Sequence, residues 1–90
     1  MSEDIYRQNK NVIFRQEEDE AIIFNPDNSD IVVINSTGCL IWPLCDGRHT
    51  KKEMVDKITG DFKVTAKKAK KDLDIFLSDL QKKNFVEKVK

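Results

Sequence analysis

Two cysteines and one histidine are the residues of this chain best suited to chemistry, and all three lie in one short stretch. The stretch runs from Ile34 to Met54, INSTGCLIWPLCDGRHTKKEM, and contains Cys39, Cys45 and His49. Such a set could supply a reactive thiol with a base, or part of a metal site. The cysteines are six positions apart, however, and structural zinc takes four ligands in tight pairs. The spacing therefore predicts no metal site.

The apolar surroundings of both thiols favour a structural role over a reactive one. Leu40, Ile41 and Leu44 are their neighbours along the chain. An apolar environment raises the pKa of a thiol, and free cysteine often packs as a small hydrophobic residue. The only carboxylate near His49 that could orient its ring is Asp46, and the three glycines are too scattered for a phosphate loop. We therefore predict that neither thiol is functional, that the protein is not an enzyme and that it uses no cofactor.

Length and charge limit the possible partners. Ninety residues fit a single domain, residues 1–90, in which residues 1–10 could be flexible. Sixteen basic residues balance sixteen acidic ones, which argues against strong binding to nucleic acid or to an anionic membrane. The opening MSEDIYRQNK lacks the apolar core of a signal peptide, and no apolar run reaches the roughly 18 residues that span a bilayer. We therefore expect a cytoplasmic protein with reduced thiols.

Three short runs rich in Ile, Val and Phe predict strands in the first half of the chain. These runs are Asn11–Gln16, Ala21–Asn25 and Asp30–Asn35. The polar run Glu17–Glu20 separates the first two, and the turn sequence Pro26–Ser29 separates the second and third. Such short connections favour an antiparallel meander.

A first helix is predicted directly after the third strand. Ser36 or Thr37 can cap its start, and Asp46–Gly47 can end it, with the glycine in a left-handed conformation. Pro43 falls inside this helix, where it lacks a hydrogen-bond donor and crowds the preceding turn. We therefore expect a kink or a 3₁₀ turn near Trp42.

Two more helices are predicted in the second half of the chain. Thr50 and Glu53 form a capping box for the second helix, which should stop at Gly60. Thr65 can cap the third helix. The apolar stripe of the third helix, which has helical period, consists of Ala69, Leu73, Phe76, Leu77 and Leu80. Phe85–Val86 should be a short extended segment.

These elements predict an α+β, winged-helix-like fold, with a three-stranded antiparallel sheet followed by a three-helix bundle. On the third helix Ile75 lies opposite the apolar stripe, among charged and polar residues. Winged-helix proteins often read DNA with their third helix, so a DNA-binding transcription regulator is the alternative function. Asp72 and Asp79 on that face would repel phosphates, and arginine, the commonest base reader, is absent from it.

The segments DIVVINSTGCLIWPLCDGRHTKKEMVDKITGDF and DLDIFLSDLQKKNFV together resemble the PqqD-like family. Members of this family are small peptide chaperones, also called precursor-peptide recognition elements. The resemblance covers about Ile22 to Val86, and Pro43 departs from the family pattern. The matching positions are Asn35, Gly38, Ile41, Trp42, Asp46, Gly47, Thr50, Glu53, Asp72, Phe76, Leu80, Phe85 and Val86.

The resemblance implies a function in peptide binding. Family members bind the leader of a ribosomally made precursor peptide and present it to a modifying enzyme, often a radical-SAM enzyme; pyrroloquinoline quinone (PQQ) biosynthesis is the best-known case. It also implies that the third strand is a sheet edge, on which a leader would add as a strand next to the third helix. The predicted peptide-binding residues are Asp30, Ile31, Val32, Val33, Ile34, Lys68, Lys71, Asp72, Ile75 and Asp79. The oligomeric state is left open.

Overall fold

The computed structural model describes residues 4–90, so that residues 1–3 of the segment expected to be flexible lie outside it. The elements in chain order are β1 (Ile5–Gln8), β2 (Ile13–Glu17), β3 (Glu20–Asn25), β4 (Asp30–Ile34), α1 (Ser36–Ile41), the 3₁₀ helix η1 (Trp42–Leu44), β5 (Asp46–Thr50), α2 (Lys51–Asp61), α3 (Ala66–Lys82) and β6 (Val86–Lys88).

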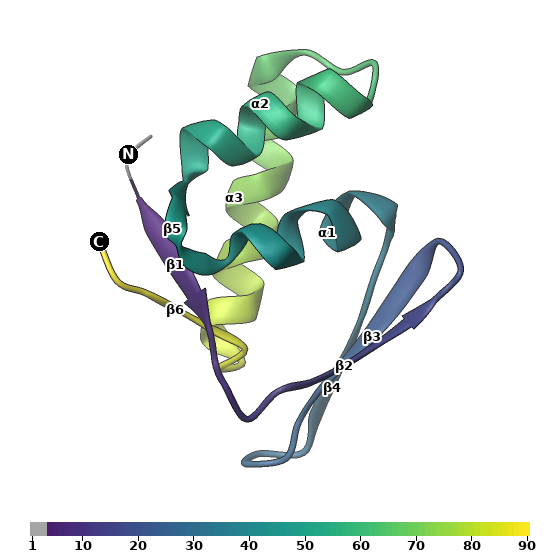
Figure 1. Cartoon of the computed structure of the whole chain (residues 1–90), viewed down its shortest axis with the longest axis vertical. Coiled ribbons are helices and arrows are strands. Elements are labelled where there is room, and N and C mark those ends of the chain that lie inside the picture. Colours follow the sequence, from purple (N-terminus) through teal and green to yellow (C-terminus); the bar gives the residue numbers. More distant parts are fainter. Residues whose placement is uncertain (1–3) are drawn as a thin grey trace.

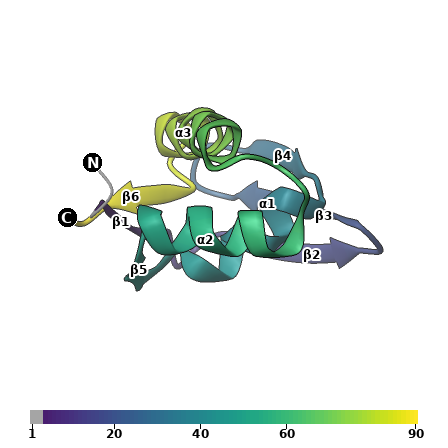
Figure 2. The ribbon, with the colours of Figure 1, turned by 90° about the horizontal axis from the view of Figure 1, so that it is seen from above.

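Two antiparallel three-stranded sheets lie on either side of the helices (Figures 1 and 2). One sheet has the order β2-β3-β4, and the other has the order β5-β1-β6. Figure 2 shows α3 almost end-on, above α1 and α2, with one sheet at each end of the molecule. No helix within residues 4–90 is both long enough and apolar enough to cross a membrane.

The predicted meander is confirmed. β2 pairs with β3 through the turn that follows Glu17, and β3 pairs with β4 with Ile23 opposite Val32. The second hairpin turn begins after Asn25, whose side chain accepts a hydrogen bond from the Asp27 amide at 3.0 Å. The α+β class, with a three-stranded antiparallel sheet and three helices, is therefore as the sequence indicated.

The sheet β5-β1-β6 was not predicted. β1 lies within the opening segment, and β5 reads DGRHT, which has no strand-like pattern of apolar residues. These strands form because β1 lies between β5 and β6 and pairs with both. The prediction that Asp46–Gly47 ends a helix was wrong, because both residues lie within β5. The expected left-handed conformation of Gly47 is confirmed by its φ of +80°, at a point where the β1–β5 register shifts.

The first helix is shorter than predicted and has a different cap. Asn35, rather than Ser36 or Thr37, is the N-cap, and its Oδ1 accepts a hydrogen bond from the Gly38 amide at 2.9 Å. The expected 3₁₀ turn is confirmed as η1, because Pro43 has no N–H to continue an α-helix.

The caps of the two longer helices are as predicted. The Thr50 Oγ1 accepts a hydrogen bond from the Glu53 amide at 3.2 Å, and the Glu53 carboxylate accepts one from the Thr50 amide at 2.9 Å. Thr65 caps α3 through one hydrogen bond, in which its Oγ1 accepts from the Lys68 amide at 3.1 Å. α3 ends with Asn84 in a left-handed conformation and a hydrogen bond from the Phe85 amide to the Leu80 carbonyl, which is a Schellman ending.

One apolar core connects both sheets and the helices. The apolar stripe of α3 contributes Ala69, Leu73, Leu77 and Leu80 to it. The Phe14 ring on β2 stacks on the Trp42 ring of η1, with 6.2 Å between their centroids. The other buried members are Tyr6, Ala21, Ile23, Ile34, Ile41, Cys45, Met54, Ile58, Phe85 and Val86.

Three asparagine side chains donate hydrogen bonds to the backbone carbonyls that follow α3. Asn25 is fully buried, and its Nδ2 donates to the Asn84 carbonyl at 3.0 Å and to the Lys83 carbonyl at 3.4 Å. Asn28 in the β3–β4 turn donates to the same Lys83 carbonyl at 3.1 Å, and Asn9 donates to the Asn84 carbonyl at 3.0 Å. These bonds hold the C-terminal end of α3 against the β3–β4 turn, which immediately precedes β4.

Replacing Asn25 by Ala should lower the free energy of unfolding by about 1–3 kcal/mol, because buried backbone groups then lose their partner. Urea denaturation followed by circular dichroism measures this change. The control is Asn28→Ala, which removes an exposed bond to the same turn and should cost about 0.5 kcal/mol. Equal costs for the two variants would show that the buried amide has no special role.

Candidate functional site

β4 is an open edge of its sheet. It pairs with β3 on one side, and no strand of the described residues pairs with it on the other. Along an edge strand, backbone N–H and C=O groups point outward from alternate residues and remain available to another chain. The edge position that the family resemblance implied for this strand is therefore confirmed.

A groove of about 360 Å³ lies between β4 and α3. One wall is formed by the end of β4 and the residue that follows it, and the other by one face of α3. Its lining residues are Val32, Val33, Ile34, Asn35, Asp72, Ile75, Phe76 and Asp79.

The groove combines an apolar centre with two carboxylates. Ile75 is 61% exposed, and Phe76 beside it is half-buried. Asp72 and Asp79 stand on either side of these two residues along α3. Each carboxylate forms an ion pair with a lysine four residues away along the chain: Asp72 with Lys68 at 3.2 Å, and Asp79 with Lys83 at 3.4 Å. The groove can therefore hold an apolar side chain flanked by polar or charged ones.

Most of the predicted peptide-binding residues meet in this groove. Those that line it are Val32, Val33, Ile34, Asp72, Ile75 and Asp79. Asp30 and Ile31 belong to the same edge strand but are not part of the lining. Lys68 contributes through its ion pair with Asp72, whereas Lys71 is exposed on α3 and does not line the groove. Whether these residues bind a peptide stays a prediction.

Two lining residues were missed because each has a second role. Phe76 belongs to the apolar stripe of α3, so its helical spacing predicted burial in the core. Asn35 ends the apolar run of the third strand and caps α1. Both are among the positions that match the family pattern, and that match was the signal that could have singled them out.

Gly38 on α1 packs closely against two residues of the groove walls, Ile34 and Phe76. A Cβ atom on Gly38 would lie 2.9 Å from the Ile34 Cβ and 3.1 Å from a ring carbon of Phe76. α1 can therefore approach both β4 and α3 only because this position has no side chain. Any larger residue would displace the Phe76 ring, which forms part of the groove wall.

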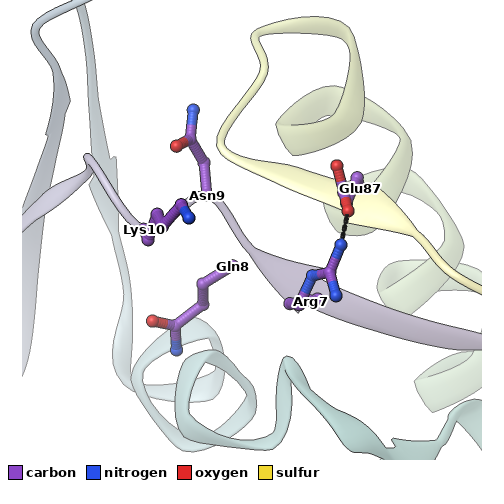
Figure 3. Close-up of a pocket in the computed structure, with 5 residues that line it drawn as sticks. All are labelled: Arg7, Gln8, Asn9, Lys10 and Glu87. Carbon is purple, nitrogen blue, oxygen red and sulfur yellow. Dashed lines mark hydrogen bonds and ion pairs between the residues drawn. The ribbon is translucent and has the colours of Figure 1, made fainter.

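A second hollow, of about 420 Å³, lies at the end of β1 and is lined by Arg7, Gln8, Asn9, Lys10 and Glu87 (Figure 3). Arg7 forms an ion pair with Glu87, and Figure 3 shows the Gln8 amide pointing away from that pair. The Gln8 amide donates to the Trp42 carbonyl at 2.8 Å, and the Asn9 amide donates to the Asn84 carbonyl. These side chains hold β1 to its neighbours, so the groove beside β4 is the better candidate site.

Comparison with known proteins gives a family and a fold. The family model for coenzyme PQQ synthesis protein D (PqqD) matches residues 20–86. A solved structure of TbiB1 in complex with the TbiA(beta) leader peptide is similar, with a TM-score of 0.81 and 23% sequence identity. The similarity covers 90% of this chain and 94% of that chain, and it shows a shared fold. No curated protein is similar enough to this chain to count as a relative.

The cysteines and the histidine do not form a reactive cluster. Both cysteines are free; Cys45 is fully buried, and burial together with the nearby Asp46 charge raises the pKa of its thiol to about 12. His49 lies in β5, and its Nδ1 is 2.9 Å from the Asp46 carboxylate. Desolvation acts to raise the pKa of Asp46, but hydrogen bonds from His49 and Arg48 hold it below its usual value. Asp46 thus organises the start of β5.

In the folded protein, Cys45 should resist alkylation by iodoacetamide at pH 7.5, because the reagent attacks thiolates and this thiol is both protonated and inaccessible. Peptide mass spectrometry after a timed reaction measures labelling at each cysteine. The partly exposed Cys39 is the internal comparison and should be labelled first. In urea both should react at similar rates. Preferential labelling of native Cys45 would show an activated thiol and contradict its structural role.

Proposed function

The chain belongs to the PqqD family, and on that premise we propose that it is a peptide chaperone for the leader of a ribosomally made precursor peptide. The observation that carries the proposal is the open edge of β4 beside an apolar groove. An extended peptide can pair with such an edge through main-chain hydrogen bonds, while a neighbouring groove selects its side chains.

In this function the leader adds as a fourth strand to the sheet β2-β3-β4. The outward N–H and C=O groups of β4 bind the peptide backbone, which gives affinity that depends little on sequence. Alternate side chains of the peptide then point toward the groove and contact Ile75 and Phe76 on α3. The other side chains lie on the outer face of the sheet beside Ile31 and Val33, which are 62% and 59% exposed.

The TbiB1 structure supports this proposal because it is a complex of a leader peptide with a chain of the same fold. The match covers nearly the whole of both chains, so the elements that form the groove have counterparts there. Binding by strand addition to a small edge suggests an affinity on the order of micromolar or somewhat tighter.

The proposed role is presentation of the peptide, with its modification left to a separate enzyme, of the radical-SAM class or another peptide-modifying class. The groove lining suits binding: it offers aliphatic and aromatic side chains, one amide and two carboxylates. Its carboxylates also disfavour the alternative of DNA recognition by α3, because they would face phosphates. Precursor synthesis on ribosomes places this function in the cytoplasm.

Replacing Ile75 by Asp should weaken leader binding by about 10- to 100-fold, since an apolar contact of about 1.5–3 kcal/mol is lost. The thermal midpoint should change little, because Ile75 is mostly exposed. Fluorescence anisotropy measures binding, with a labelled leader taken from a short precursor reading frame beside the gene.

The matched control for this test is Ile13→Asp. Ile13 is 57% exposed on β2, the opposite edge of the same sheet, and receives the same change of side chain. This variant should bind the leader as the unmodified protein does. The proposal fails if Ile75→Asp binds the leader normally, or if both variants lose binding to the same extent.

A further inference from the structure

The charge of the groove restricts the kind of peptide that it can hold. Its lining contains two carboxylates, those of Asp72 and Asp79, and no basic side chain. Between them lie the exposed Ile75 and the half-buried Phe76. A peptide with acidic side chains directed into the groove would meet repulsion at both ends, whereas basic side chains would be attracted.

The spacing of the carboxylates is set by the helix. Asp72 and Asp79 are seven residues apart, two turns of α3, so their Cα atoms are separated by about 10.5 Å along the helix axis. The apolar contact formed by Ile75 and Phe76 lies midway between them. The α3 wall therefore has the order acidic, apolar, acidic.

In an extended peptide, the side chains on one face recur at a distance similar to the spacing of the α3 residues in the groove. Its residues rise about 3.4 Å each and alternate between faces, so positions i, i+2 and i+4 point to one side and span about 13.5 Å. For a peptide that runs along the axis of α3, a residue at i+2 that faces Ile75 has positions i and i+4 slightly beyond the two carboxylates, because about 13.5 Å exceeds the separation of about 10.5 Å. The long, flexible side chains of Lys and Arg can reach back over such a short distance.

The lysines already paired with these carboxylates do not prevent this recognition. The Lys68–Asp72 and Lys83–Asp79 pairs join side chains that are roughly half exposed. Exposed pairs at i, i+4 spacing are weak, so their lysines can rotate away into solvent. Asp72 also lines a smaller hollow of about 160 Å³ beside Asn35 and Thr37, which gives a basic side chain room to enter.

We propose that the leader bound in this groove carries an apolar residue with Lys or Arg two positions before it and two positions after it. The two intervening residues face Ile31 and Val33 on the outer side of the sheet, where β-branched side chains form good cross-strand neighbours. This inference rests on the proposed function, because it describes the peptide that the same groove binds.

Labelled host peptides test the pattern. The first contains Lys-Thr-Leu-Thr-Lys in a Ser/Thr-rich host; the others replace both lysines by Gln, replace both by Glu, or replace the leucine by Ser. Binding to the full chain is measured by fluorescence anisotropy. The basic peptide should bind at least about tenfold more tightly than the acidic one, with the Gln peptide between them. Loss of leucine should also weaken binding about tenfold.

Variants of the protein test whether the carboxylates of Asp72 and Asp79 cause this preference for the basic peptide. The double variant Asp72→Asn, Asp79→Asn should reduce the preference to less than about threefold, and the double variant to Lys should reverse it. The control is the double variant Asp56→Asn, Asp61→Asn, which makes the same change of net charge at exposed positions of α2. This control should keep the full preference.

The outcomes separate this inference from the proposed function. If the natural leader binds and loses affinity on Ile75→Asp, but the host peptides show no charge preference or do not bind, the pattern is wrong and the proposed function stands. If binding of the host peptides and of the natural leader is insensitive to Ile75→Asp, both are wrong. A preference for the basic peptide that survives the Asp72, Asp79 double variant would assign it to another surface and overturn the inference.

Discussion

The buried amide of Asn25 sets the position of the β2-β3-β4 sheet relative to α3. It lies at the start of the β3–β4 turn and binds the backbone carbonyls that follow α3, while its own oxygen orders the turn. β4 begins immediately after that turn, so one amide fixes both walls of the groove at one end. At the other end, the absence of a side chain at Gly38 lets α1 pack closely between the same two walls.

Local signals were enough to predict the elements that form the groove walls. The apolar runs separated by turn residues predicted the meander, and the capping threonine with the helical stripe predicted α3. The sheet β5-β1-β6 depends on long-range pairing, such as Arg7 opposite Asp46. An extended segment was predicted only at Phe85–Val86, where β6 begins, whereas β1 and β5 gave no clear strand signal. The N-cap of the first helix was assigned to the wrong residue because Asn35, Ser36 and Thr37 can all cap, and only the three-dimensional packing selects among them.

Helical periodicity and the family resemblance predicted part of the candidate site. The helical period placed Ile75 outside the core, and the family resemblance placed β4 at an edge; the structure confirms both positions. The contribution of Phe76 was hidden because one ring serves both the core and the groove. The acidic, apolar, acidic order along α3 could not be interpreted from the sequence, because only the structure shows that Asp72 and Asp79 line one groove together with the end of β4.

Backbone amide shifts of the ¹⁵N-labelled protein on addition of a cognate leader test most directly whether the peptide adds to β4. Strand addition changes the hydrogen bonding of the outward amides of Ile31–Ile34 and the environment of residues 68–82 across the groove. The largest shifts should fall in these two segments. Shifts concentrated instead on α2 and on Asp46–Thr50 would place the peptide elsewhere and contradict strand addition to β4.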